Sequence, residues 1–154
     1  MIRRAFVFLL AALISIGTVV AGSAEPAAHA LLHGIWRHQT LQQFADGKLV
    51  RSQDVPDGST MQFNADGTWA LTTARSKSSG TYRWLNDETI ETIIVQSDIP
   101  AQIGFVGKKQ IEVDSKSLRV TVVYDEDGMR AFRPRDDGTR PKEMRVLSTF
   151  ERVR

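Results

Sequence analysis

Short stretches of alternating hydrophobic and polar residues follow one another along the chain from residue 34 onward. Alternation with a period of two is typical of half-buried β-strands, because successive side chains point to opposite faces of a sheet. The residues that share a face in the clearest stretches are Trp69, Leu71 and Thr73; Tyr82 and Trp84; and Leu118, Val120, Val122 and Tyr124. After residue 24 only residues 27–32 favour a short helical turn, so the pattern predicts an all-β protein.

Asp-Gly pairs separate many of these stretches. Asp accepts turn conformations and Gly reaches positive φ without steric cost, so the pair is a marker of β-hairpins. The pairs begin at Asp46, Asp57, Asp66, Asp127 and Asp137. The strands predicted around these and other turns cover residues 35–44, 48–53, 60–64, 68–74, 80–85, 89–96, 109–114, 117–124, 129–134 and 144–153.

Strands this short, joined mostly by local turns, indicate an antiparallel meander. An open sheet exposes two edges, and closure into a barrel removes both. A β-sandwich is the alternative, but sandwiches usually need long crossovers, and the only long irregular segment is 97–108. We therefore predict one domain, an antiparallel up-and-down β-barrel of 8–10 strands over residues 34–154, preceded by a short segment at 25–33.

Residues 1–24 have the three-part layout of a secretory signal peptide. Arg3 and Arg4 precede an uncharged, largely apolar run over residues 5–21, and small residues follow up to Ala24. Cleavage is expected after Ala24, with Ala21 and Ala30 as alternative sites. The chain has no cysteine, so it has neither a disulfide nor the attachment point of a lipoprotein anchor. We expect an exported protein, periplasmic or secreted, that meets the membrane only through its leader.

The charge of the mature chain does not favour nucleic acid as a partner. The whole chain has 20 Lys and Arg against 18 Asp and Glu, but Arg3 and Arg4 belong to the leader. Residues 25–154 are therefore neutral, and a neutral domain lacks the positive field that binding to phosphates requires. The oligomeric state leaves no trace in the residue types.

Several motifs occur in a fixed order along the mature chain. Gly34-Ile35-Trp36 opens the first predicted strand, and Arg152 lies at the end of the last. Between them come Met61-Gln62-Phe63-Asn64-Ala65-Asp66-Gly67-Thr68-Trp69, Ser79-Gly80-Thr81-Tyr82, and Ile99-Pro100 followed by Ile103-Gly104. Together they resemble the bacterial lipocalin-like domain of the lipocalin and calycin superfamily. The resemblance implies a barrel closed at its base by Gly34, Trp36 and Arg152, where a guanidinium over an indole contributes about 0.5–2 kcal/mol.

Six aromatic residues fall where the strand pattern predicts inward positions or a loop over the barrel mouth. They are Trp69, Tyr82, Trp84, Phe105, Tyr124 and Phe132. A barrel of eight strands is either filled by its own side chains or holds one small ligand. The six aromatics are therefore either a packed core or the wall of a ligand-binding cavity with Phe105 as its lid, and the sequence leaves both open.

No arrangement of residues points to catalysis, a metal or a cofactor. The only histidines, His29, His33 and His38, lack the Glu that a helical zinc motif places beside its first His. Residues 104–109 contain Gly and Lys without the spacing of a phosphate-binding loop, and the acidic residues 125–127 fit a polar hairpin tip better than a calcium loop. We predict no catalytic residue, no bound metal and no cofactor.

The preferred function is therefore the binding of a small hydrophobic or amphipathic molecule in the barrel interior, without catalysis. One alternative is a small isomerase or cyclase whose cavity orients a reactive substrate, with Glu91, Tyr124 or a neighbouring arginine as the acid or base. Another is a protein-interaction or inhibitor module of the cell envelope that uses the loops at 54–59, 75–79, 97–108 and 135–142. A titratable group facing an open cavity would favour the enzyme, and a plugged barrel with an apolar loop patch would favour the interaction module.

Overall fold

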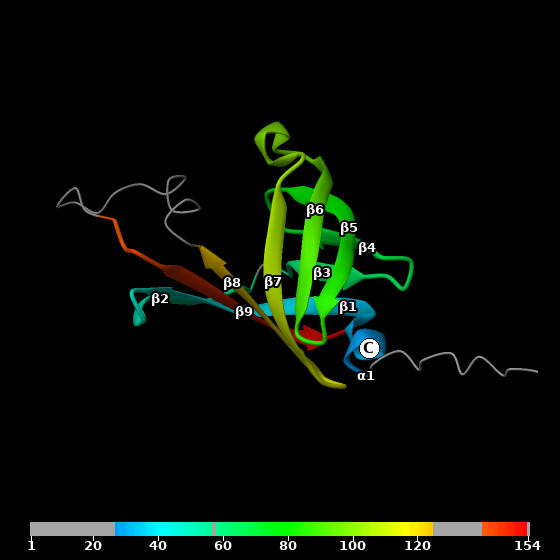
Figure 1. Cartoon of the computed structure of the whole chain (residues 1–154), viewed down its shortest axis with the longest axis horizontal. Helices are drawn as coiled ribbons and strands as arrows, with labels where there is room; N and C mark the ends of the chain where they lie inside the picture. The colour runs from blue at the N-terminus through cyan, green and yellow to red at the C-terminus, as the bar shows by residue number, and fades with distance from the viewer. Residues whose placement is uncertain (1–26, 57, 125–139, 154) are drawn as a thin grey trace, which may run out of the picture.

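The computed structural model describes residues 27–56, 58–124 and 140–153 (Figure 1). The elements run in the order α1 (Ala27–Leu32), β1 (Gly34–Ala45), β2 (Lys48–Asp54), β3 (Thr60–Phe63), β4 (Thr68–Thr72), β5 (Lys77–Asn86), β6 (Thr89–Ser97), the 3-10 helix η1 (Pro100–Gln102), β7 (Val106–Val113), β8 (Ser117–Tyr124) and β9 (Met144–Arg152). The predicted leader and the predicted strand at 129–134 lie outside the described residues. Within the described part, no helix has the length and hydrophobicity needed to cross a bilayer.

The sheet closes on itself, as the sequence pattern predicts. Each strand from β3 to β9 pairs with the next in antiparallel fashion, and β9 then pairs with β1 from Trp36↔Arg152 to Ala45↔Met144. Hydrogen bonding between the first and last strands leaves the ring without an open edge at that point. The predicted all-β antiparallel barrel is therefore confirmed, with eight strands around the closed ring.

The strand count depends on how β2 is placed. Strand β1 is long, and one of its edges pairs with β3 over residues 34–37 and with β2 over residues 40–45. Thus β2 and β3 occupy the same edge of β1 in succession, separated by the connection at 55–59, and β2 adds no further position to the ring. The described residues contain nine strands for an eight-stranded barrel, which resolves the expected range of eight to ten.

Two of the Asp-Gly pairs form the tight turns that they predict. Asp46 and Gly47 connect β1 to β2 with φ values of 50° and 78°, and Gly67 turns β3 into β4 with φ of 80°. The Asp66 carboxylate accepts hydrogen bonds from the Thr68 amide and hydroxyl at 2.9 and 2.6 Å, which stabilises that turn. The pairs at 127 and 137, and Asp57 of a third, lie outside the described residues.

Large side chains fill the base of the barrel, where α1 and the β5–β6 turn meet. Leu32 of α1 and the strand residues Trp36, Phe63, Ile90 and Leu118 are the largest fully buried side chains. Leu32 also accepts a hydrogen bond at its carbonyl from Trp36 Nε1, at 2.8 Å. The predicted helical turn at 27–32 thus forms and packs into the core, so the base of the barrel is plugged.

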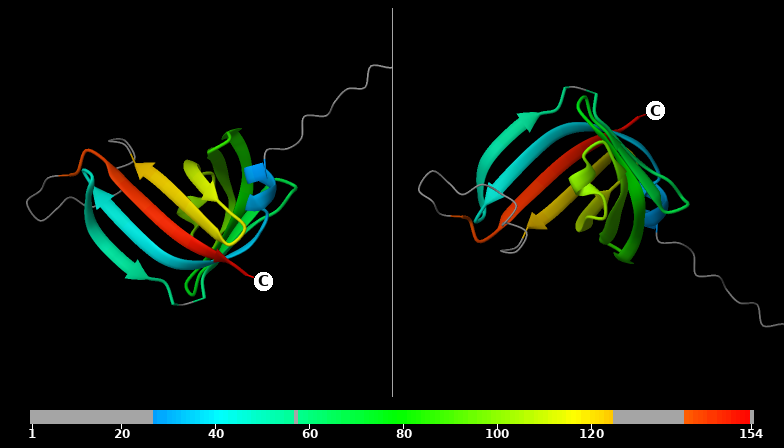
Figure 2. Two further views of the ribbon diagram at one scale, coloured as in Figure 1. Left: turned by 90° about the horizontal axis from the view of Figure 1, so that it is seen from below. Right: turned by 90° about the horizontal axis from the view of Figure 1, so that it is seen from above.

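Four strand segments continue beyond the barrel as a curved sheet (Figures 1 and 2). Strand β2, the second half of β1, the first half of β9 and the end of β8 pair with one another there. Strand β8 pairs with β7 only up to Thr121↔Gln110, whereas it pairs with β9 up to Tyr124. The barrel wall therefore divides between β7 and β8, and this division forms its open end.

Strand β7 begins earlier than the sequence predicts. The expected irregular segment 97–108 is shorter, because Val106 and Gly107 pair with Ile93 and Thr92 of β6. A glycine at 107 suggests a loop, but a Cβ there would lie 3.1 Å from the Phe105 ring. Glycine at 107 leaves room for the Phe105 ring to lie along the strand. The prediction of an irregular segment up to residue 108 was therefore wrong, because this glycine belongs to a strand and not to a loop.

Candidate functional site

Arg152 joins the two ends of the chain at the base of the barrel. Its guanidinium lies 4.2 Å from the ring centre of Trp36. It donates to the carbonyl of His33 at 2.9 Å, to that of Ser115 at 3.1 Å and to that of Leu31. A Cβ on Gly34 would lie 2.7 Å from Arg152 Nη1, and Gly34 has φ of 137°. Only glycine fits at 34 beside this guanidinium, so the closure residues expected from the sequence lie together.

The six aromatic residues predicted for the interior divide into separate groups. Tyr82 and Trp84 belong to the packed base. The Tyr82 hydroxyl donates to the Asn64 carbonyl at 2.9 Å, and the Trp84 ring stacks on the ring of His29 in α1 with 4.0 Å between the ring centres. Trp69 is buried in the same core, whereas Phe105 and Tyr124 line a hollow and Phe132 lies outside the described residues. The predicted set is therefore split between the packed core and a hollow that reaches both faces of the barrel wall.

The hollow lies where β7 and β8 separate, and its volume is about 490 Å³. Its walls are mainly apolar and aromatic, with two lysines and one glutamate among them. The lining residues are Glu91, Phe105, Val106, Gly107, Lys108, Lys109, Val122, Val123 and Tyr124. A concave, partly apolar site with few polar groups is the usual form of a small-molecule site, and 55% of the Phe105 surface is exposed at its rim.

Lys109 is the polar group that points into the barrel at this hollow. It lies two residues before buried Ile111, and so on the same face of β7, and pairs with fully buried Ile90 of β6. Its Nζ donates to the Thr92 hydroxyl at 2.6 Å and lies 6.0 Å from the ring centre of Trp69. Among residues 27–56, 58–124 and 140–153, no carboxylate lies within salt-bridge distance of this ammonium group.

Burial changes the acidity of two groups at the hollow. Desolvation lowers the pKa of Lys109 to about 8, because a charged ammonium is less stable away from water. Desolvation also raises the pKa of the Tyr124 phenol, because the charged phenolate is less stable away from water. Near neutral pH the site thus offers a positive charge and a neutral phenol against apolar walls.

Sequence reasoning missed Lys109 because its neighbours resemble a loop. The glycines at 104 and 107 and the second lysine at 108 suggested an exposed segment over the barrel mouth. The available signal was the alternation within the predicted strand 109–114, which places residue 109 on the same face as Ile111. A lysine at such a position is seldom buried without an acidic partner, which marks it as a candidate functional residue.

The other groups considered for chemistry are engaged elsewhere. The Glu91 carboxylate, a candidate acid, accepts from Arg83 at 2.7 and 2.9 Å on the outer side of β5 and β6. His29 stacks on Trp84 and His38 on Phe150. In the described part of the chain, no three His, Asp or Glu side chains converge on a common point.

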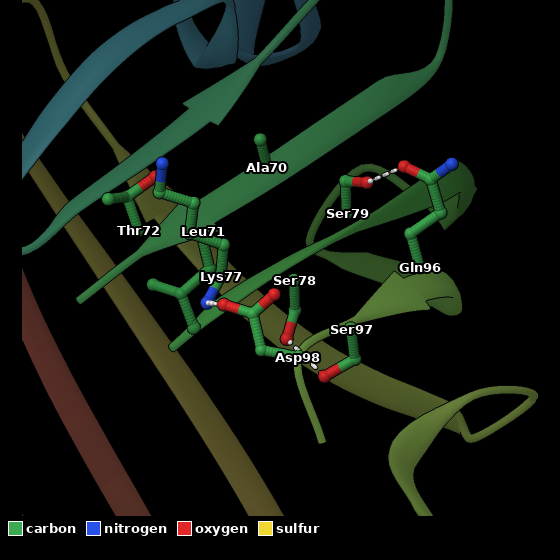
Figure 3. Close-up of a pocket in the computed structure, with 9 residues that line it drawn as sticks. All are labelled: Ala70, Leu71, Thr72, Lys77, Ser78, Ser79, Gln96, Ser97 and Asp98. Atoms are coloured by element: carbon green, nitrogen blue, oxygen red, sulfur yellow. Dashed lines mark hydrogen bonds between the residues drawn. The ribbon is translucent and has the colours of Figure 1, made fainter. Parts of the chain in front are cut away.

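A second hollow, of about 400 Å³, lies beside the ends of β4, β5 and β6 (Figure 3). Its polar groups bond to one another: the Lys77 amide donates to Asp98 at 2.8 Å, and the Ser78 and Ser97 hydroxyls lie 3.0 Å apart. Ser97 also donates to Gln102 at 3.0 Å. These bonds hold the β6–η1 connection against β5, so the hollow is explained by local structure.

Lys109 should make stability depend on pH in a defined direction. Below about pH 8 the lysine is charged in both states, so folding includes the cost of desolvating it. Between about pH 8 and 10.5 the folded protein has lost this proton while the unfolded chain keeps it, so stability rises with pH. Lys109→Met should remove this rise and stabilise the protein at pH 7 by on the order of 1–2 kcal/mol, allowing for partial exposure.

Urea unfolding at pH 7 and 9.5, monitored by tryptophan fluorescence, measures this effect. The comparison stops at pH 9.5 because the raised pKa of Tyr124 has the opposite effect only near and above pH 10. The exposed neighbour Lys108→Met serves as the control and should keep the pH dependence of the natural protein. An unchanged pH dependence in Lys109→Met would show that this ammonium is not desolvated.

No protein-family model matches the sequence, and no curated protein matches it either. The family expected from the sequence motifs is therefore supported through the fold alone. A closed, antiparallel, eight-stranded barrel with its ends joined by an arginine over a tryptophan is compatible with a lipocalin-like fold.

Proposed function

We propose that this protein is an exported binding protein for one small amphipathic molecule with an anionic end. The apolar part of the ligand occupies the hollow between β7 and β8, against Phe105, Val122 and Tyr124. The anionic end meets the ammonium group of Lys109. Export rests on the leader-like residues 1–24, as set out from the sequence.

The observation that carries this proposal is the position of Lys109. A cation inside a barrel, with a hydroxyl as its hydrogen-bond partner and no carboxylate beside it in the described residues, is a ready site for an anion. The adjoining hollow is large enough for a short chain or ring system and is open to solvent on one side. Burial of the apolar part supplies affinity at about 25 cal/mol per Å², and Lys109 supplies orientation.

The exposed Phe105 side chain has a role in this arrangement. It lies at the rim of the hollow, next to the position that a Gly107 side chain would occupy. An exposed ring of this size gains contact area when a ligand fills the space beneath it. Phe105 is thus the part of the wall that closes over the ligand.

Two ligands of the same chain length, one with a charged and one with a neutral head group, test the proposal. Dodecanoate and dodecanol are titrated against the protein at pH 7 with tryptophan fluorescence and calorimetry as readouts. Lys109→Met should weaken dodecanoate binding about 10- to 100-fold, because a hydrogen bond to a charged group contributes about 1.5–3 kcal/mol. Dodecanol binding should change less than threefold or so, since it has no charge to pair.

Lys48→Met is the matched control, because Lys48 is an exposed lysine of β2 that does not line the hollow. This variant should keep the affinity of the natural protein for dodecanoate. Raising the pH through 8 should weaken dodecanoate binding, since Lys109 then loses its charge. Equal loss of affinity in both variants, or no binding of either ligand, would contradict the proposed site.

A further inference from the structure

We propose that Lys109 also captures small apolar aldehydes covalently and reversibly, as an imine at its Nζ inside the hollow. This inference rests on the binding site proposed above and extends it from charge pairing to bond formation. It draws on the placement of the amine, its access to the hollow and the chemistry of its surroundings.

The placement of Nζ is fixed by its neighbours. Nζ donates to Thr92 Oγ1 at 2.6 Å, and Thr92 is itself buried and donates to the Gly107 carbonyl at 3.3 Å. Gly107 leaves the space next to Nζ open, since a Cβ at 107 would lie 3.5 Å from that nitrogen. The amine is therefore held in one position beside free volume, which favours attack on a bound carbonyl.

The walls of the hollow select the co-reactant. Phe105, Val122 and Tyr124 offer apolar and aromatic contacts. Glu91, the carboxylate among the lining residues, is paired with Arg83. An aldehyde with a short hydrocarbon chain or an aromatic ring places its apolar part against these walls. Its carbonyl carbon then lies toward Nζ, because the polar end of the aldehyde is more stable beside this polar group than against the apolar walls.

The reaction balances without any oxidant or reductant. The neutral amine of Lys109 attacks the carbonyl carbon, a C–N bond forms, and the amine proton passes to the oxygen to give a carbinolamine. The carbinolamine then loses its hydroxyl group and the second nitrogen proton as one water molecule, which leaves a C=N bond. Addition of water reverses both steps and returns the free aldehyde.

Desolvation makes this amine more reactive than an exposed one. Burial lowers the pKa of Lys109 to about 8, so roughly a tenth of it is neutral at pH 7. An exposed lysine with the ordinary pKa has well under a thousandth of its amine in that form. Part of this advantage is offset because a less basic amine is a weaker nucleophile, so the net gain is about tenfold.

Reductive trapping of the full-length chain with hexanal tests the inference. The protein is incubated with hexanal and cyanoborohydride at pH 7, and the hexyl-lysine formed is mapped by tandem mass spectrometry. Lys109 should be labelled about ten times faster than the exposed Lys48, Lys77, Lys108 and Lys116 of the same molecule, and its rate should rise with pH to a plateau above pH 8. Labelling that follows exposure alone, with Lys109 no faster than Lys108, would overturn the proposal.

Two variants separate this inference from the proposed binding function. Lys48→Met, a change of an exposed lysine outside the hollow, should keep the fast labelling at position 109, whereas Lys109→Met should lose the fast phase and keep the slow labelling elsewhere. If dodecanoate binding depends on Lys109 but hexanal does not react there, the covalent inference is wrong and the binding function stands. If neither ligand depends on Lys109, both proposals are overturned.

Discussion

Replacing Arg152 by alanine should lower the free energy of unfolding by about 3 kcal/mol. The guanidinium donates to three backbone carbonyls from two segments, residues 31–33 and Ser115, and covers the Trp36 ring. Hydrogen bonds from a charged group contribute about 1.5–3 kcal/mol each without being additive, and the contact over the ring adds about 0.5–2 kcal/mol. The loss should be large because alanine leaves all of these groups without their partner.

Urea unfolding monitored by tryptophan fluorescence measures this loss. Arg145→Ala is the matched control, because Arg145 lies on the same strand and over an aromatic ring, Phe44, at 4.7 Å, but is exposed. The control should lose less than about 1 kcal/mol. Arg152→Lys should fall between the two, since a lysine reaches one carbonyl but cannot form the planar fork. Equal stability of the two alanine variants would refute a closing role for Arg152.

Gly80→Ala should destabilise the barrel by about 3 kcal/mol or more. Gly80 lies in β5 opposite a bulge in β6, where pairing passes from Ser79↔Gln96 to Gly80↔Ile94. A Cβ at this position would lie 1.8 Å from the carbonyl oxygen of Ile93. The clash is with backbone rather than with a flexible side chain, so one strand must move away from the other.

Gly107→Ala provides the comparison for this glycine. There the added Cβ meets the exposed ring of Phe105 at 3.1 Å, and that ring is free to rotate outward. The substitution at 107 should therefore cost less than about 1 kcal/mol, as measured by the same urea unfolding. If Gly80→Ala unfolds at the same urea concentration as the natural protein, the close approach of β5 and β6 is incorrect.

The structure explains why two of the sequence motifs contain a glycine. Ser79-Gly80-Thr81-Tyr82 and Gly34-Ile35-Trp36 were part of a family resemblance at the level of sequence. In the fold, Gly80 is required by a β-bulge on the neighbouring strand, and Gly34 by the guanidinium of a residue 118 positions away. Neither partner is local, so no local pattern identifies it.

The all-β class, the tight turns at Asp46 and Asp66 and the closed barrel followed from the sequence alone. Side-chain alternation and turn chemistry act over two to four residues, and such signals are visible without knowing the fold. The inward positions of Trp69 and Tyr82 follow from the same alternation, since a strand has only two faces.

The tertiary structure decided which part of the interior is filled and which is hollow. Trp84 lies under α1 and His29, whereas Phe105 and Tyr124 line a hollow, although all three are aromatic residues of one predicted set. Alternation already places Lys109 on the face of Ile111, but only the pairing of β7 with β6 shows that its ammonium group is buried against Thr92. Both results depend on where β7 separates from β8. That point is set by pairing between distant strands and by the helix that fills the base of the barrel, and the local alternation of residues contains no information about strand pairing or helix packing.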